Sequence, residues 1–103
     1  LHPHSVAARI TPKTLAIPAV HPWGNSCDLD ALAALCRGRE IVLIEDCAQA
    51  FGATWKGCPV GTLAPIGCFS LNEFKHISCG DGGIVLTDDD DLAVRLRLAT
   101  DKG

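Results

Sequence analysis

The chain has 103 residues, of which 48% are hydrophobic and 20% charged, and its formal net charge is −3 at pH 7. Acidic and basic residues are interspersed, which argues against a nucleic-acid partner or binding to a membrane surface. No apolar run approaches the about 18 residues that cross a membrane, and neither end carries a targeting signal. The composition is that of a soluble globular segment, and the absence of methionine predicts that it is part of a longer protein.

The first half of the chain predicts a strand, a helix and a second strand. Residues 6–10 resemble the end of a helix, and the apolar run 15–20 is a strand candidate in which Pro18 argues against a central position. Apolar residues then recur at helical spacing over 28–37, and Gly38 ends that helix. Residues 41–44 form a fully apolar strand followed directly by acidic residues.

The second half of the chain contains more turn residues than the first half, and it also contains further strand and helix candidates. Continuous apolar strands such as 41–44 are typical of a sheet that is covered on both faces. The chain therefore predicts an α/β fold with a doubly wound, mostly parallel sheet, whose ligands gather at the carboxyl ends of the strands. The further elements expected are strands at 53–55, 68–71 and 83–87, the last after a tight turn at 81–82, and a helix over 89–99.

Three polar side chains stand at predicted strand ends. Asp46 closely follows an apolar run, so burying its carboxylate without a partner would be costly. It could pair with the protonated nitrogen of a pyridine ring, or it could simply cap the next turn. Gln49, one turn further on, could reach the same ligand or lie at the surface. Ser70 could donate its hydroxyl to a phosphate or be an ordinary strand-end serine.

Lys75 lies between a strand candidate and a cluster of glycines at positions 80, 82 and 83. Judged by itself it would be a solvated lysine, and the glycines would be an ordinary hairpin turn. Together with Asp46, however, it suggests a cofactor chemistry in which an amine forms a Schiff base and a carboxylate keeps a ring nitrogen protonated. The ordered set of residues is more specific than any one member.

Metal sites are not expected. The six cysteines contain no Cys-x-x-Cys pair, so they are expected to be reduced cytosolic thiols rather than zinc ligands, and no activating partner for Cys47 as a nucleophile is evident. The aspartates 88–91 lack the glycine and glutamate of a calcium-binding EF-hand loop, and Asp88 or Asp89 is expected to cap a helix. His21 either lies near a ligand or fills a loop.

Several separated motifs resemble the DegT/DnrJ/EryC1/StrS family, the pyridoxal-phosphate-dependent sugar aminotransferases of aspartate-aminotransferase fold type I. The similarity runs from about residue 10 to residue 103. It implies that residues 1–103 are a central part of the large cofactor-binding domain, without its N-terminal part and without the C-terminal small domain. The motifs that carry the resemblance, in order and spacing, are 19–24, 44–50, 67–70 and 75–83.

The resemblance implies a role for each of the four site residues. Lys75 matches the lysine that holds pyridoxal 5'-phosphate and later moves a proton, and Asp46 matches the carboxylate that pairs with the pyridinium nitrogen. Gln49 matches a position that contacts the region of the cofactor ring, and Ser70 matches a serine that contacts the phosphate. The residues expected to bind the cofactor are therefore Asp46, Gln49, Ser70 and Lys75, with Lys75 as the catalytic residue.

The implied reaction moves an amino group from an amino acid, with glutamate as the expected donor, to a keto group of a nucleotide-linked sugar. Such reactions make amino sugars for cell-surface polysaccharides or secondary metabolites. The intact enzyme is expected to be a cytoplasmic homodimer with its site at the subunit interface, and the 103-residue piece is expected to be inactive.

Three alternatives remain open. A related dehydratase would carry histidine in place of the lysine, and Lys75 argues against it. A non-catalytic or regulatory protein could bind pyridoxal phosphate on the same fold. A thiol-rich metal-binding module would need cysteine pairs that the sequence lacks.

Overall fold

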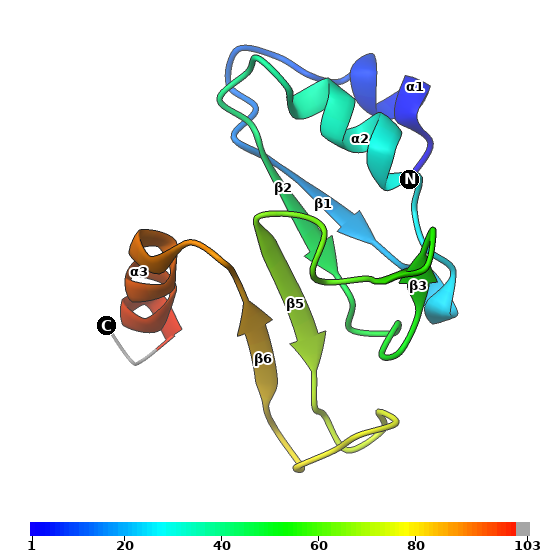
Figure 1. Cartoon of the computed structure of the whole chain (residues 1–103), viewed down its shortest axis with the longest axis vertical. Coiled ribbons are helices and arrows are strands. Elements are labelled where there is room, and N and C mark those ends of the chain that lie inside the picture. The colour runs from blue at the N-terminus through cyan, green and yellow to red at the C-terminus, as the bar shows by residue number, and fades with distance from the viewer. Residues whose placement is uncertain (101–103) are drawn as a thin grey trace.

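The computed structural model describes residues 1–100, and its centre is a four-stranded sheet (Figure 1). The strands lie in the order β1-β2-β5-β6. The first three run parallel, and β6 runs antiparallel to β5. The α/β class with a mainly parallel sheet is therefore confirmed. The strand bounds are Ala16–Val20 for β1, Val42–Asp46 for β2, Ile66–Ser70 for β5 and Gly83–Leu86 for β6.

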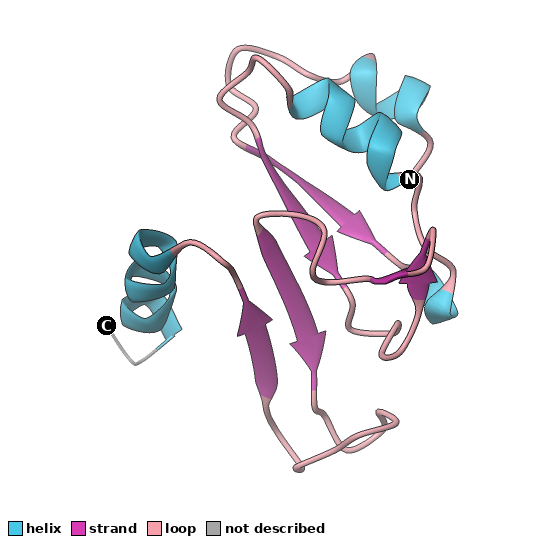
Figure 2. Cartoon of the chain, viewed as in Figure 1, coloured by secondary structure: helices cyan, strands magenta, loops and turns pink. Residues whose placement is uncertain are grey.

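Two helices, α1 (Pro3–Ala7) and α2 (Leu29–Cys36), lie together beside β1 and β2, and α2 packs on both strands (Figure 2). A short 3-10 helix, Pro22–Gly24, follows β1, and α3 (Asp90–Thr100) follows β6. Within residues 1–100, none of these helices has the length and apolar character that crossing a membrane requires.

Aspartates begin both longer helices. The Asp28 Oδ1 accepts the backbone N–H of Ala31 at 3.0 Å, and the Asp89 Oδ1 accepts that of Leu92 at 2.8 Å. Each carboxylate satisfies one of the backbone donors that a helix leaves free in its first turn. Of the two candidates at the start of α3, Asp89 is therefore the cap.

The core explains how β1 accommodates its proline. Alternate residues of β1, Ile17 and Ala19, are buried against α2, whereas Pro18 is exposed. Within the described sheet β1 is an edge strand, where a residue without an N–H costs no ladder hydrogen bond. The main buried cluster comprises Ile17, Ala19, Cys27, Leu29, Leu32 and Leu43.

Of the two connections in the second half, one agrees with the sequence-based expectation and one differs. Between β2 and β5 the chain makes a two-stranded antiparallel sheet from β3 (Thr54–Trp55) and β4 (Cys58–Pro59), and β3 lies within the strand expected at 53–55. Glycines and prolines at 57, 59, 61 and 65 keep the rest of this segment in turns, because neither residue sustains a helix. The β5–β6 connection is a long loop over residues 71–82, so the tight two-residue turn expected at 81–82 was wrong.

Gly67 in β5 has no room for a side chain. A Cβ atom built there would lie 2.0 Å from the carbonyl oxygen of Gly61, a backbone atom that cannot rotate away. In the full-length protein that carries this segment, Gly67→Ala should lower the free energy of unfolding by about 3 kcal/mol, as overpacked cores do.

Denaturant unfolding measures this effect, with Gly38→Ala as the matched control. Unlike Gly67, Gly38 lies in the left-handed region, with φ +72°, and it faces open space, so only backbone strain of about 1 kcal/mol is expected there. An equal loss of stability in the two variants would show that the close approach of Gly67 to Gly61 is not restrictive.

Candidate functional site

A cavity of about 340 Å³ opens at the carboxyl ends of the parallel strands. Its walls come from the segments that follow β1 and β2, from the last residue of β5 and from the 71–82 loop. This is where ligands gather in doubly wound sheets. The cavity brings together three of the four residues predicted from the sequence, Gln49, Ser70 and Lys75. The lining residues are Trp23, Cys47, Ala48, Gln49, Phe51, Ser70, Phe74, Lys75, His76 and Ile77.

Asp46 is the last residue of β2 and directly precedes the wall residue Cys47, but it is not itself part of the cavity wall. Its side chain is half-buried, and its Oδ1 accepts the backbone N–H of Ala48 at 3.0 Å. The carboxylate thus caps the following turn, which was the plainer of the two interpretations. Within residues 1–100 the Oδ2 atom has no hydrogen-bond partner, so one oxygen remains available to a ligand.

Gln49 and Ser70 each accept a hydrogen bond within the protein, and neither has a partner for its donor among residues 1–100. The Gln49 Oε1 accepts the backbone N–H of Trp23 at 3.3 Å, which leaves the amide NH₂ to donate. The Ser70 Oγ accepts the N–H of Asn72 at 3.3 Å, which leaves the hydroxyl hydrogen to donate. Both side chains are therefore prepared to donate to an electron-rich ligand.

Lys75 is half-buried and lies in a loop that the backbone holds in shape. Its N–H donates to the carbonyl of Asn72 at 3.0 Å, and the N–H of Cys79 donates to the carbonyl of Leu71 at 3.0 Å. Within residues 1–100, no carboxylate or other side chain engages the Lys75 amine. An amine that lines a cavity without an ion-pair partner is free to react or to bind.

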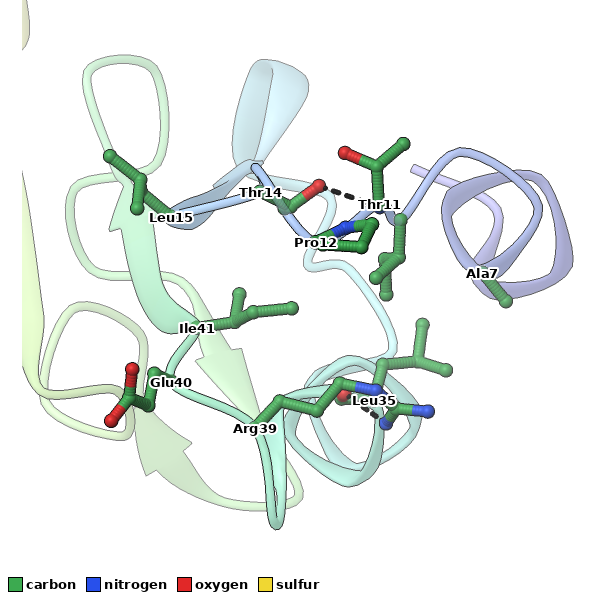
Figure 3. Close-up of a pocket in the computed structure, with 10 residues that line it drawn as sticks. Ala7, Thr11, Pro12, Thr14, Leu15, Leu35, Arg39, Glu40 and Ile41 are labelled. Carbon is green, nitrogen blue, oxygen red and sulfur yellow. Dashed lines mark hydrogen bonds between the residues drawn. The ribbon is translucent and has the colours of Figure 1, made fainter.

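A larger cavity, of about 580 Å³, lies on the other side of the molecule, between α1, the end of α2 and the start of β1 (Figure 3). It contains none of the residues predicted to bind a ligand. Two of its polar side chains are paired locally: Arg39 donates to the carbonyl of Leu35 at 2.7 Å, and the Thr14 hydroxyl accepts the N–H of Thr11 at 2.9 Å. It is at the wrong end of the strands to be the candidate site.

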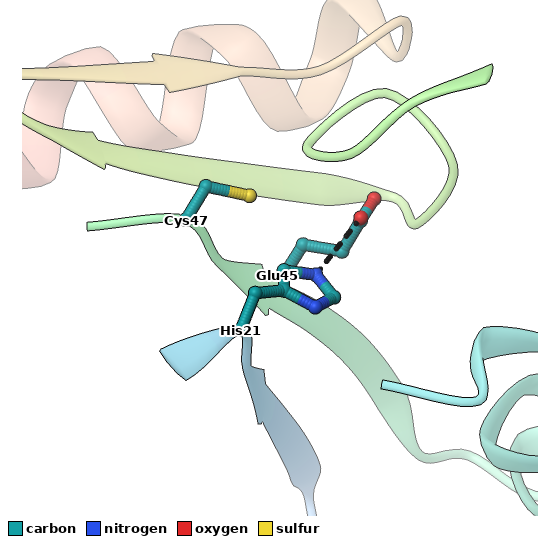
Figure 4. Close-up of side chains that lie close together, drawn as sticks. All are labelled: His21, Glu45 and Cys47. Carbon is teal, nitrogen blue, oxygen red and sulfur yellow. Dashed lines mark hydrogen bonds and ion pairs between the residues drawn. The ribbon is translucent and has the colours of Figure 1, made fainter. Parts of the chain in front are cut away.

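A buried polar cluster was missed at the sequence level. His21, Glu45 and Cys47 lie with their ligand-type atoms within 4.8 Å of one another (Figure 4). His21 and Glu45 are 0% exposed. Strand alternation would have marked Glu45 as buried, because it lies two residues after the core residue Leu43 on the same face of β2.

This cluster is not a metal site. Each Glu45 oxygen already accepts two N–H groups. The Oε1 atom accepts those of Leu63 and Ala64, and the Oε2 atom accepts those of Gly61 and His21. A cation would have to compete with four hydrogen bonds for the carboxylate. The expectation that the chain holds no metal stays a prediction, and the one geometric candidate within residues 1–100 is otherwise occupied.

Cys47 lines the cavity but is not a nucleophile. Burial raises the pKa of its thiol to about 12, and the nearby carboxylates of Glu45 and Asp46 oppose the thiolate further. Because the thiolate is the reactive form, the group is inert at neutral pH. All six cysteines are free thiols, in keeping with the expectation of reduced cysteines.

Alkylation tests the assignment of Cys47. Since its pKa is raised, the thiol stays protonated until the pH approaches 12, and iodoacetamide at pH 8 should leave Cys47 unmodified in the native full-length protein. Peptide mass spectrometry measures the modification, with the exposed Cys58 as the internal comparison. Modification of Cys47 as fast as that of Cys58 would contradict the inert assignment.

The sequence of the chain is similar to those of known proteins. It is 50% identical over 97 residues to protein MosB of Rhizobium meliloti, covering 94% of this chain and 19% of that protein. It is 46% identical over 97 residues to L-glutamine:2-deoxy-scyllo-inosose aminotransferase of Streptomyces lividus, covering 94% of this chain and 23% of that protein. The chain thus spans about a quarter or less of these relatives.

Solved structures agree with the sequence comparison. DesI, solved in the presence of its TDP-sugar product, superposes with a TM-score of 0.89 at 40% identity, covering 94% of this chain and 25% of DesI. The E. coli GDP-4-keto-6-deoxy-D-mannose-3-dehydratase with bound hydrated PLP gives a TM-score of 0.83 at 32% identity, covering 94% of this chain and 25% of that one.

The family comparison covers the whole chain. Residues 1–103 match the model of the DegT/DnrJ/EryC1/StrS aminotransferase family. This match includes all four residues to which the sequence resemblance gave a role. The chain belongs to the DegT/DnrJ/EryC1/StrS aminotransferase family.

Proposed function

We propose that this chain is a central part of the large domain of a pyridoxal-phosphate-dependent aminotransferase that acts on a nucleotide-linked keto sugar. The observation that carries the proposal is the shared cavity of Lys75, Ser70 and Gln49, with Asp46 at the adjoining strand end, in a chain of this family. The intact protein would be a cytoplasmic homodimer with its site at the subunit interface.

The groups around the cavity fit the chemical groups of pyridoxal phosphate. The cofactor presents an aldehyde, a phosphate, a ring nitrogen and a ring oxygen. Among the described residues 1–100, Lys75 offers an unpaired amine, Ser70 a free hydroxyl donor, Asp46 a free carboxylate oxygen and Gln49 a free amide donor. When bound, the cofactor supplies an electron-withdrawing ring that stabilises negative charge on the carbon carrying the amino group.

Each residue then has a defined task. The Lys75 amine would hold the cofactor and would accept and return the proton of the substrate carbon. The free oxygen of Asp46 would face the ring nitrogen, where its half-buried position would make an ion pair stronger than it would be in water. The Ser70 hydroxyl would donate to the phosphate, and the Gln49 amide would donate to the ring oxygen.

The amino donor and the acceptor define the test. Glutamate is the proposed donor, and glutamine is the competing one because a relative is named for it. The full-length protein, loaded with the cofactor, is mixed with each amino acid, and the change in the near-visible absorbance is followed. Product analysis then compares a nucleotide-linked 4-keto sugar with a keto cyclitol such as 2-deoxy-scyllo-inosose.

Transfer from glutamate to the nucleotide-linked sugar is the expected result. Transfer to the cyclitol alone would contradict the proposed acceptor, and transfer from glutamine alone would contradict the proposed donor. Cofactor binding without transfer from either amino acid would favour a non-catalytic protein on the same fold. Because no side chain in the described part of the chain pairs with the Lys75 amine, this amine supports the enzymatic alternative.

A further inference from the structure

We infer that Glu45 and His21, which the proposed chemistry does not use, are positioning residues that set the direction of the Asp46 carboxylate. The inference rests on the proposed function, since it concerns the residue assigned to the ring nitrogen. It comes from the buried hydrogen bonds of Glu45 and His21, of which Figure 4 shows the one between the two side chains, rather than from the cavity wall.

Glu45 ties β2 to the segment that precedes β5. Its Oε1 accepts the N–H groups of Leu63 and Ala64, each at 2.8 Å, and its Oε2 accepts the N–H of Gly61 at 2.7 Å. A buried charge is tolerated only when it is hydrogen-bonded in this way. Because both oxygens face donors, the group must be an ionised carboxylate.

His21 completes the network in a single tautomer. Its Nδ1 accepts the backbone N–H of Cys27 at 3.0 Å, so that nitrogen carries no hydrogen. The proton therefore lies on Nε2, which donates to the Glu45 Oε2 at 3.2 Å. This assignment follows from the hydrogen-bond partners and makes the imidazole neutral.

The network reaches Asp46 through the backbone. The backbone N–H of His21 donates to the backbone carbonyl of Asp46 at 3.0 Å, and this bond ties the end of β1 to the end of β2. Glu45 and Asp46 are consecutive in a strand, so their side chains leave opposite faces. Because the hydrogen bonds hold the Glu45 side chain on the inner face of the sheet, they also hold the β2 backbone in the orientation that directs the Asp46 side chain to the opposite face. Asp46 does not line the cavity wall itself, so this direction decides whether its free oxygen reaches a ligand.

An amide cannot replace the carboxylate. In Glu45→Gln, the new NH₂ group would face either Leu63 and Ala64 or Gly61 and His21, and both pairs are donors. His21 cannot relieve the conflict by moving its proton to Nδ1, because Nδ1 would then face the Cys27 N–H. An isosteric change that removes only the charge should therefore disturb Asp46.

The test uses the full-length protein loaded with pyridoxal phosphate that carries ¹⁵N at its ring nitrogen. The ¹⁵N NMR shift reports whether that nitrogen is protonated, and titration gives the dissociation constant. Glu45→Gln is compared with Asp46→Asn, with the exposed Glu40→Gln as the matched control, and with His21→Asn, which can keep the acceptor for Cys27 but loses the donation to Glu45.

Wild type and Glu40→Gln should show a protonated ring nitrogen, and Asp46→Asn an unprotonated one. Glu45→Gln should shift the signal toward that of Asp46→Asn and weaken cofactor binding about tenfold, with a smaller effect in the same direction for His21→Asn. Thermal unfolding is recorded for every variant, because a purely structural role would lower the melting temperature and leave the ring-nitrogen signal unchanged.

The outcomes separate the two proposals. If the folded Glu45→Gln variant keeps the wild-type ring-nitrogen signal and affinity, the positioning role is wrong while the proposed function stands. If Glu45→Gln does not fold, an unchanged signal in His21→Asn overturns the inference. If wild type binds no cofactor, the proposed function fails first.

Discussion

Lys75→Ala is expected to abolish amino transfer, with turnover falling by at least about 1,000-fold in the full-length protein. Lys75 lines the cavity, and its amine has no ion-pair partner within residues 1–100. Without it no other described residue of the cavity offers an amine, so covalent attachment of the cofactor has no substitute and the proton transfer loses the group assigned to it. The near-visible absorbance of the loaded protein and the steady-state turnover measure the two losses.

A matched control separates the loss of a reactive amine from the loss of a positive charge. Lys13 is exposed and distant from the cavity wall, and Lys13→Ala should leave both absorbance and turnover unchanged. Turnover of Lys75→Ala within tenfold of wild type would show that another group performs the chemistry.

Asp46→Ala should give the second-largest effect. At saturating cofactor the protein should keep its near-visible band, because Lys75 is intact, but turnover should fall by about 100-fold or more. Without a carboxylate beside it the ring nitrogen loses its proton, and the ring withdraws electrons less strongly. Turnover and absorbance are measured on the same preparation, so that cofactor loading and chemistry are scored separately.

The control for Asp46 is Asp28, an aspartate that also caps a backbone N–H but lies away from the cavity. Asp28 also accepts a backbone N–H with its carboxylate, at the start of α2. Asp28→Ala should lower stability by about 1 kcal/mol, the usual cost of a lost cap, and spare turnover. If Asp46→Ala behaved in the same way, the carboxylate would be only a turn cap and its pairing with the ring nitrogen would be wrong.

The secondary structure could be predicted where the signal is local. Apolar runs and helical spacing gave strands near β1, β2, β5 and β6 and helices near α2 and α3, with bounds that differ by one or two residues. Pro18 raised a valid objection to a central strand, and the strand exists because β1 is at the edge of the described sheet. The β3–β4 pair was only partly predicted, because two-residue strands have no periodicity to detect.

The candidate site, like the secondary structure, could be predicted only where the signal is local in the sequence. Spacing and family resemblance predicted Lys75, Ser70 and Gln49 as site residues, and the fold brings these three to one cavity. The role of Glu45 could not be predicted, because its partners Gly61, Leu63 and Ala64 lie 16 to 19 residues away, across a turn-rich segment. Tertiary packing decides which backbone N–H groups donate to a buried carboxylate, and no local sequence pattern predicts these partners.

Borohydride trapping on the full-length protein tests the central claim most directly. The protein is mixed with pyridoxal phosphate, reduced, digested and analysed by peptide mass spectrometry. A stable cofactor adduct is expected on the peptide that contains Lys75, and none is expected in Lys75→Ala. An adduct on another lysine, or no adduct in a protein with Lys75 intact, would contradict the central claim.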